Sequence, residues 1–449
     1  MKVINLASSN FPTGQSWLAN FFLEIQVMIY DFEPENYWRG VGIGQWELHE
    51  HKRHLQRWMP VLADRTTFTF DPSLQIEACE EFPSALNLDR PTILVVRDDR
   101  DVVYSQMKRD GFGGALEEFV RLPFPLLGIP AVLENALCNE LWMEMVPQDR
   151  LHLVRFEDLK TSPEATVAAL LQFLGIHRGA ASIDRAIASC SLDRARSAAN
   201  RFGGGGASGA KVRRGQAHEW KEHMSPSQQS LFTGFPEGVR SRLGYDVSTA
   251  VEPDRDPPSF ARPALDALAN SWTSYLFDRN PPRCTSARRQ DYRRVLGLSV
   301  ERMWGAAWLR FQAANICLDV GSPDLANQIL TTLDKAAASD DLLEACAALM
   351  RYRMSPGPRA DLDETLRTVQ SPAAREHAFT VSLDQIGVVH SLRVWSVLFP
   401  DRGHSRAIMA IFALAYRRFA ARLARDLPRG VFCVFLRLVE RLRARVGAY

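Results

Sequence analysis

The sequence predicts an α/β fold with a parallel sheet, followed by an all-α C-terminal domain. A run of β-favouring residues at 92–96 is apolar throughout, which is typical of a strand buried on both faces. A second strand-like run at 2–7 leads through a Gly-containing loop into an apolar helix at 17–23. Beyond a Pro- and Asp-rich stretch at 249–262, the composition shifts to Ala, Leu and Arg, which favours helices.

We therefore expect a first domain at 1–248, a linker at 249–262 and a helical domain at 263–449. A chain of 449 residues with 46% hydrophobic and 24% charged residues has an ordinary globular composition. Its seven Cys are dispersed and form no CxxC pair, which indicates free thiols in a reducing compartment. No secretory leader and no run of about 18 apolar residues is visible, so we expect a cytoplasmic protein. A net charge of +2 provides no basis for expecting a nucleic-acid partner.

The small polar loop at 8–16 is the first candidate anion site. It stands between the strand at 2–7 and the apolar helix, so its backbone N–H groups and the helix dipole would favour negative charge. The loop lacks the spacing of a Walker A motif. The alternative is a plain turn in which Thr13 or Ser16 caps the helix.

The stretch after the 92–96 strand is the second candidate anion site. Ligands of open α/β sheets bind at the carboxyl ends of the strands, so Arg97 stands where a ligand anion would lie. Ser105, further along the following helix, would add a hydroxyl. The alternative is that Arg97 and Arg100 only pair with the neighbouring Asp side chains in a solvated turn.

Three later segments complete the pattern. We expect a helix around 131–146 and another buried strand starting at 151. Ser162 and Pro163 then predict the start of a helix that ends at Gly175. A basic segment at 211–224 follows a run of glycines and ends in Trp-Lys-Glu-His, which a simple solvent loop would not predict.

In this order and at this spacing, the segments resemble sulfotransferases that use 3′-phosphoadenosine 5′-phosphosulfate (PAPS). The loop at 13–17 resembles their Ser-Gly-Thr-Thr-Trp, and the stretch at 97–102 resembles Arg-Asp-Pro-Arg-Asp-Val with Asp in place of Pro. Residues 155–159 resemble Arg-Tyr-Glu-Asp-Leu, and 189–192 the Ser-Phe segment beside adenine. Residues 213–223 resemble the family's Arg-Lys-Gly and Trp-Lys-x-His tail.

The resemblance implies a three-layer parallel sheet of P-loop-like type over residues 1–250 and PAPS as the co-substrate. It also implies roles for eleven residues. The 5′-phosphosulfate would be held by Thr13, Gly14, Gln15 and Ser16, adenine would contact Trp17 and Phe156, and the 3′-phosphate would be held by Arg97, Ser105, Arg213, Arg214 and Gly215. Two arginines can fork onto a phosphate dianion, which suits that position.

Two departures from the family concern catalysis. Pro12 stands where the family has the Lys that neutralises charge on the leaving oxygen, and the unplaced candidates to replace it are Lys52, Arg53 and Lys211. We matched the family's Lys-Thr-His-x-Pro, whose His is the general base, to residues 68–72, where Phe70 replaces the His. The candidates for the base were therefore Asp71, His51 and His54.

The predicted function is transfer of a sulfuryl group to a hydroxyl or amine acceptor without a metal. The acceptor would be a small molecule, a carbohydrate or a carrier-bound substrate. One alternative is a nucleotide-binding protein of this fold without activity. Another is an interaction protein acting through residues 405–449, where ten Arg against two acidic residues suit an anionic membrane or an acidic partner. That region would equally suit a helical hairpin packed on its own domain.

Overall fold

The core of the first half is a five-stranded parallel sheet in the order β2-β5-β1-β6-β7. A computed structural model describes residues 2–31, 45–47, 67–69, 71, 73–124, 126–194, 215–246, 257–278, 284–333, 340–356 and 359–401. The strands of the sheet are β1 (Lys2–Ala7), β2 (Met28–Asp31), β5 (Leu74–Cys79), β6 (Thr92–Val96) and β7 (Leu151–Arg155). Two short strands, β3 (Gln45–Glu47) and β4 (Thr67–Thr69), form a separate antiparallel pair.

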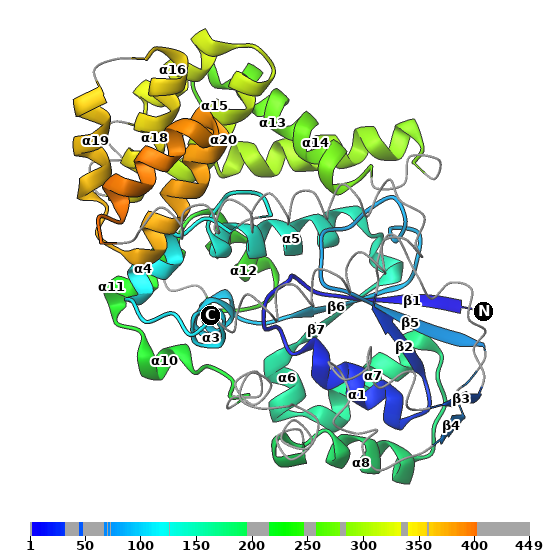
Figure 1. Cartoon of the computed structure of the whole chain (residues 1–449). Helices are drawn as coiled ribbons and strands as arrows, with labels where there is room; N and C mark the ends of the chain where they lie inside the picture. The colour runs from blue at the N-terminus through cyan, green and yellow to red at the C-terminus, as the bar shows by residue number, and fades with distance from the viewer. Residues whose placement is uncertain are drawn as a thin grey trace. The chain divides into compact units, whose positions relative to one another are not determined.

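Helices cover both faces of the parallel sheet (Figure 1). One face carries α1 (Gln15–Glu24), α6 (Phe156–Thr161), α7 (Pro163–Leu174) and α8 (Ala180–Ser189). The other carries α5 (Ala131–Met145) and α12 (Phe235–Arg242). Between the sheet and α1, fully buried residues such as Ile4, Phe21 and Ile76 form the main apolar cluster. The predicted three-layer α/β arrangement with a parallel sheet is confirmed.

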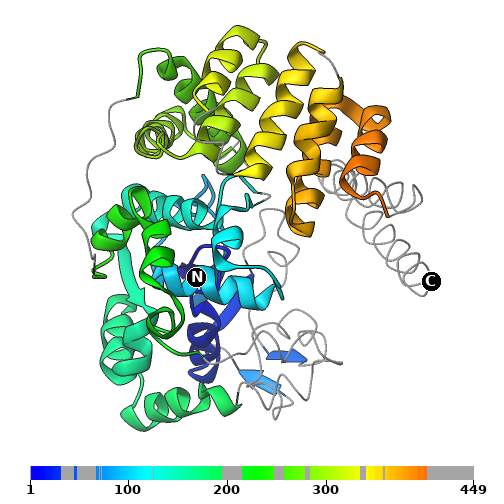
Figure 2. The ribbon, with the colours of Figure 1, turned by 90° about the vertical axis from the view of Figure 1, so that its left-hand side faces the viewer.

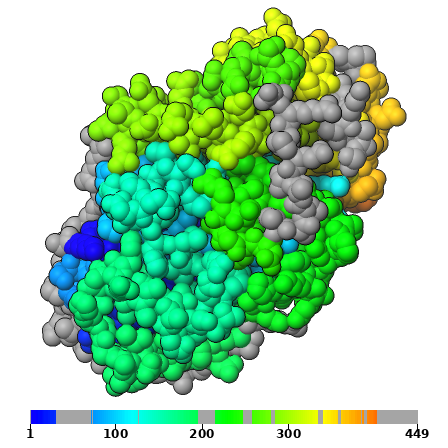
Figure 3. Space-filling model, turned by 180° about the vertical axis from the view of Figure 1, so that it is seen from behind, coloured from blue at the N-terminus to red at the C-terminus, as the bar shows by residue number. Residues whose placement is uncertain are grey.

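Further helices, most of them short, complete this part. They are α3 (Asp99–Arg109), α4 (Leu116–Arg121), α10 (Trp220–His223), α11 (Pro226–Gln229) and the 3₁₀ turns Gln148–Arg150 and Ser230–Phe232. Seen from behind, the surface of 150–195 lies beside that of 215–245 (Figure 3). A hydrogen bond from Arg155 Nη1 to the Gly244 carbonyl, at 2.9 Å, joins the two segments.

The chain divides by its internal contacts into two compact units, Met1–Thr331 and Thr332–Tyr449. The first unit therefore includes α13 (Ala261–Leu276), α14 (Ser286–Arg302), α15 (Ala307–Asp319) and α16 (Pro323–Thr331). We had assigned these helices to the second domain on composition. Glu140 of α5 explains part of the difference, because it forms ion pairs with Arg242 of α12 and Arg302 of α14.

The second unit is helical where it is described, as predicted. Its helices are α18 (Asp341–Met354), α19 (Arg359–Thr368) and α20 (Pro372–Leu398), which pack side by side (Figure 2). Trp395 contacts both Phe379 and Phe399 at ring-centroid distances of 4.8 and 4.4 Å. In the part of the chain that the structure describes, no helix has the length and apolar character needed to cross a membrane. The basic segment 405–449 lies outside the described residues.

Candidate nucleotide-binding site

The loop at 8–16 lies at the carboxyl ends of β1 and β5. The Ser8 N–H donates to the Cys79 carbonyl at 2.9 Å, and the Gln15 side chain donates to the Leu6 carbonyl at 2.5 Å. These two bonds hold the loop against the ends of both strands. The helix α1 starts directly after it, so the loop carries the positive end of the helix dipole. The site predicted from the loop and the helix N-terminus is therefore present as a local structure.

Gly14 gives this loop a conformation that other residues adopt poorly. Its φ is +95°, in the left-handed region, and it immediately precedes α1. A Cβ at this position would lie 2.3 Å from Cδ2 of Phe156, so the phenyl ring packs directly on the glycine. The neighbouring Thr13 hydroxyl is buried and has no hydrogen-bond partner among the described residues. A buried hydroxyl without a partner is rare, and it suits a site that a ligand completes.

Arg97 links this loop to two other segments. It follows β6 directly, and its guanidinium donates to the Pro12 carbonyl at 3.4 Å and to the Gln216 carbonyl at 2.9 Å. The same guanidinium lies 4.6 Å from the centre of the Phe156 ring and 3.6 Å from the Asp101 carboxylate. Only 6% of Arg97 is exposed, and within the described part of the chain its Nε has no hydrogen-bond partner. A buried cation thus stands where the three predicted nucleotide segments meet.

The acidic residues around Arg97 form buried contacts that stabilise the fold. They do not form a solvated turn. Asp98 caps α3 and pairs with Arg100 at 2.6 Å, while Asp99 pairs with Arg240 at 2.7 Å. All four side chains are buried, so the alternative of a solvent-exposed ion cluster is wrong. Burial raises the pKa of Asp99 to about 7, although the neighbouring Arg240 opposes that rise.

Asp101 fixes the basic segment that starts at Gly215. Its two carboxylate oxygens accept the backbone N–H groups of His218 and Trp220, both at 2.8 Å. The Trp220 ring lies under the Arg100 guanidinium at 3.6 Å. Burial raises the pKa of Asp101 to about 6, and the charge of Arg97 opposes that rise. The predicted Trp-Lys-x-His tail is therefore anchored to the start of α3.

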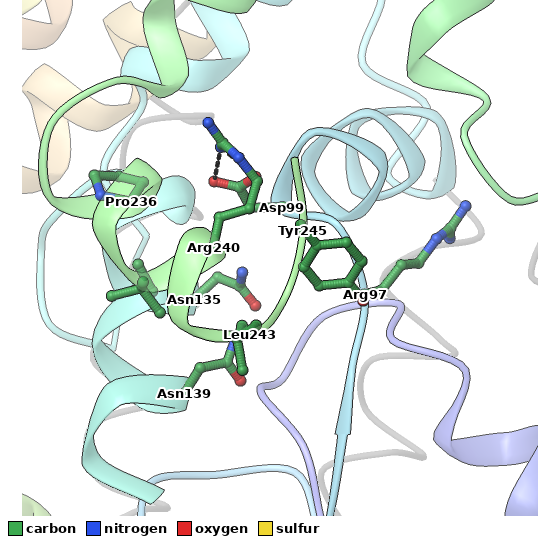
Figure 4. Close-up of a pocket in the computed structure, with 10 residues that line it drawn as sticks. Arg97, Asp99, Asn135, Asn139, Pro236, Arg240, Leu243 and Tyr245 are labelled. Carbon is green, nitrogen blue, oxygen red and sulfur yellow. Dashed lines mark hydrogen bonds and ion pairs between the residues drawn. The ribbon is translucent and has the colours of Figure 1, made fainter. Parts of the chain in front are cut away.

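A small cavity lies behind this cluster (Figure 4). It has a volume of about 10 Å³, the size of a single water molecule. Two atoms in its wall, Asn139 Oδ1 and Arg240 Nε, are buried and form no hydrogen bond with any described residue. The Arg97 guanidinium points away from Arg240 in this view.

The remaining predicted nucleotide residues lie at different depths. Gln15 is buried, Ser16 is exposed, and Trp17 stacks on Phe21 with ring centres 6.1 Å apart. Ser105 lies half-buried on α3. Gly215 is described, with φ of +57°, but Arg213 and Arg214 lie outside the described residues.

Asp71 does not lie where the predicted general base must be. It precedes β5, its N–H donates to the Gln26 carbonyl beyond the far end of α1, and its carboxylate lies 3.6 Å from Arg178. The phosphosulfate loop stands at the other, carboxyl end of β5. A helix of ten residues separates the two places by roughly 15 Å. This placement argues against Asp71 as the base, while His51 and His54 lie outside the described residues.

Two carboxylates that the sequence reasoning missed lie nearer to the loop. Glu80 and Glu81 directly follow β5, whose last carbonyl accepts the Ser8 N–H. The Trp142 indole N–H donates to the Glu81 carbonyl at 2.9 Å, which fixes this turn on α5. The order Cys79 to Pro83 also fits the family's Lys-Thr-His-x-Pro, with Glu81 at the His position. The sequence alone therefore allows two placements of this motif, at 68–72 and at 79–83.

Other proposed replacements for the loop Lys are not placed. Lys52, Arg53 and Lys211 all lie outside the described residues. Within the described part of the chain, no three His, Cys, Asp or Glu side chains group as a metal site would require.

Comparison with known proteins agrees with these observations on one segment. Residues 78–237 match the sulfotransferase domain family. Among solved structures, a mouse sulfotransferase complexed with PAP is 15% identical, with 55% of this chain and 85% of that chain covered and a TM-score of 0.35. Retinol dehydratase in complex with androsterone and inactive cofactor PAP is 13% identical, with coverage of 57% and 83% and the same TM-score of 0.35. A search of curated proteins found no match. The predicted resemblance to the sulfotransferase family is thus confirmed over residues 78–237.

Proposed function

We propose that this protein transfers a sulfuryl group from PAPS to a hydroxyl or amine group of an acceptor. The observation that carries the proposal is the meeting of four features at the carboxyl ends of β1 and β6: the loop at Gly14, the buried Arg97, the Phe156 ring and the turn at Gly215. They come from segments far apart in the sequence. Two buried polar atoms there, Thr13 Oγ1 and Arg97 Nε, have no hydrogen-bond partner among the described residues. The family match over 78–237 supports the same assignment.

The residues present fit a nucleotide with two anionic groups. The loop at 13–16 would hold the 5′-phosphosulfate through backbone N–H groups and the Thr13 hydroxyl. Arg97, with Gly215 and the adjacent Arg213 and Arg214, would hold the 3′-phosphate. Phe156 and Trp17 would contact adenine.

In the reaction the acceptor oxygen or nitrogen attacks sulfur, the bond from sulfur to the phosphate oxygen breaks, and the acceptor loses a proton. We assign the uptake of that proton to Glu81, since it follows the strand end next to the loop. Glu80 is its neighbour and serves as the comparison. The leaving phosphate gains negative charge, which the backbone N–H groups of the loop and the positive end of the α1 dipole would offset.

The test is transfer of radioactive sulfate from labelled PAPS to pooled hydroxyl and amine acceptors, in wild type, Glu81→Gln and Glu80→Gln. Loss of the proton acceptor should lower kcat by about 100- to 10,000-fold in Glu81→Gln, with little change in nucleotide affinity. Glu80→Gln, the comparison, should keep its kcat. Transfer that neither variant affects would remove the proton role from this turn.

A second candidate is a nucleotide-binding protein without turnover. Pro12, which occupies the place of the family's Lys, favours it, because a proline brings no charge to the leaving oxygen. Binding of PAPS without transfer of label to any acceptor class would support this candidate.

A further inference from the structure

Lys160 lies beside the proposed nucleotide site, although no motif of the sequence singled it out. It is on α6, four residues after Phe156, and its ammonium lies 5.6 Å from the centre of the Phe156 ring. A Cβ added at Gly215 would lie 3.5 Å from Lys160 Nζ and 3.7 Å from its Cε. The end of the lysine therefore reaches the same turn to which Arg97 donates, at the Gln216 carbonyl.

The charge of Lys160 is not balanced by a carboxylate among the described residues. Arg97 lies against the same phenyl ring at 4.6 Å and pairs with Asp101. Burial, and next the positive charge of Arg97, lower the pKa of Lys160. Two cations that lie against one buried ring repel each other, and a bound anion would offset both the repulsion and the lost hydration.

We propose that Lys160 is an additional ligand of the nucleotide 3′-phosphate, which it contacts together with Arg97 and the Gly215 turn. This inference rests on the proposed function, because it needs a nucleotide in the site. The position of Lys160 next to Gly215, the turn that we assign to the 3′-phosphate, assigns it to the same group. A phosphate dianion suits this place because two cations and a glycine turn can approach it from different sides.

The experiment compares the binding of 3′-phosphoadenosine 5′-phosphate (PAP) and adenosine 5′-monophosphate by isothermal titration. The variants are Lys160→Gln, Lys160→Arg and, as matched control, Lys108→Gln. Lys108 is exposed on α3, and its ammonium lies over the Tyr104 ring at 5.4 Å, so the control also removes a lysine from an aromatic ring.

Loss of one charge-assisted contact should weaken PAP binding by Lys160→Gln roughly 10- to 100-fold. Binding of the monophosphate should change less than about twofold, Lys160→Arg should recover most of the affinity for PAP, and Lys108→Gln should bind like wild type. Equal loss for both nucleotides, or unchanged PAP binding by Lys160→Gln, would overturn the inference alone. Wild type that fails to bind PAP would instead overturn the proposed function on which it rests.

Discussion

Glu134, in the first turn of α5, is a buried carboxyl that forms no ion pair with any described residue. Only 3% of its surface is exposed, and no described residue donates a hydrogen bond to its Oε2. Burial raises its pKa from 4.5 to about 7, against a backbone hydrogen bond from Leu127. Its neighbour Asn135 accepts the Ser9 hydroxyl at 2.6 Å, so α5 here supports the phosphosulfate loop. Replacing Glu134 with Gln keeps the shape and removes the charge.

The direction in which Glu134 changes the stability with pH follows from proton binding. Since the pKa is higher in the folded state, the folded protein binds more protons than the unfolded chain between pH 4.5 and about 7. Glu134 therefore lowers the free energy of unfolding as pH rises through that window. The difference in pKa corresponds to about 3 kcal/mol at alkaline pH, and it vanishes below the unfolded pKa. The new amide NH₂ stays unpaired, which costs about 1 kcal/mol at every pH.

We expect Glu134→Gln to be about 2 kcal/mol more stable than wild type at pH 8.5 and no more stable at pH 5. The measurement is urea unfolding of both proteins at several pH values between 5 and 8.5, followed by fluorescence. Glu164→Gln is the control, because Glu164 lies exposed in the first turn of α7. A stability difference that stays constant over this pH range would refute the account of Glu134.

Three further outcomes follow from single contacts. Gly14→Ala should destabilise the fold by about 1 to 3 kcal/mol and abolish PAP binding, because its Cβ would meet the Phe156 ring. Gly175→Ala is the control: this glycine has a φ of +69° and open space around it, so the variant should lose about 1 kcal/mol of stability and bind PAP normally. Asp101→Asn keeps one acceptor for two N–H groups, so hydrogen exchange should increase in the segment that starts at residue 215, and unchanged exchange would contradict the anchoring role. Glu140→Gln removes its ion pairs with Arg242 of α12 and Arg302 of α14, while Arg242 keeps its pair with Glu144, and we expect a loss of about 1 to 3 kcal/mol with faster exchange in α14. Equal exchange in α14 would show that apolar packing alone holds that helix.

Much of the scaffold was predictable because its signals are local. Buried strands at 92–96 and 2–7 are short, largely apolar runs, which is the local signal of a strand in a parallel sheet. Gly14 and Gly175 mark left-handed positions at the two ends of helices, where the sequence alone indicates glycine. The position of Arg97 followed because it directly follows a predicted strand, whereas Phe156 lay inside the strand predicted over 151–159, which ends at Arg155 in the structure.

Asp71 is a candidate base because residues 68–72 occupy roughly the place of the family's Lys-Thr-His-x-Pro. The strand at 67–69 belongs to a separate antiparallel pair, and β5 begins only at Leu74. From the sequence alone, it cannot be told which of two neighbouring short strands pairs with β1 and therefore ends beside the loop at 8–16. The hydrogen bond from Ser8 to Cys79 shows that this strand is β5, and that contact spans far more sequence than any local pattern.

Long-range polar partners also escaped the sequence. Arg240 pairs with Asp99 across 141 positions, and the Trp220 N–H reaches Asp101 across 119. Charge spacing within 97–101 favours local pairing instead, as the turn alternative assumed. Similarly, the composition shift near residue 250 suggested a domain boundary, but α14 packs on α5 through Arg302 and Glu140.

The central claim is that a nucleotide with a 3′-phosphate binds where the loop at Gly14 meets Arg97. Titration of wild type and Arg97→Ala with PAP tests it most directly, with Arg121→Ala at the exposed end of α4 as control. We predict micromolar binding by wild type and by the control, and a loss of at least about tenfold in Arg97→Ala. Absence of binding by folded wild type, or equal affinity in all three proteins, would contradict the assignment of this site.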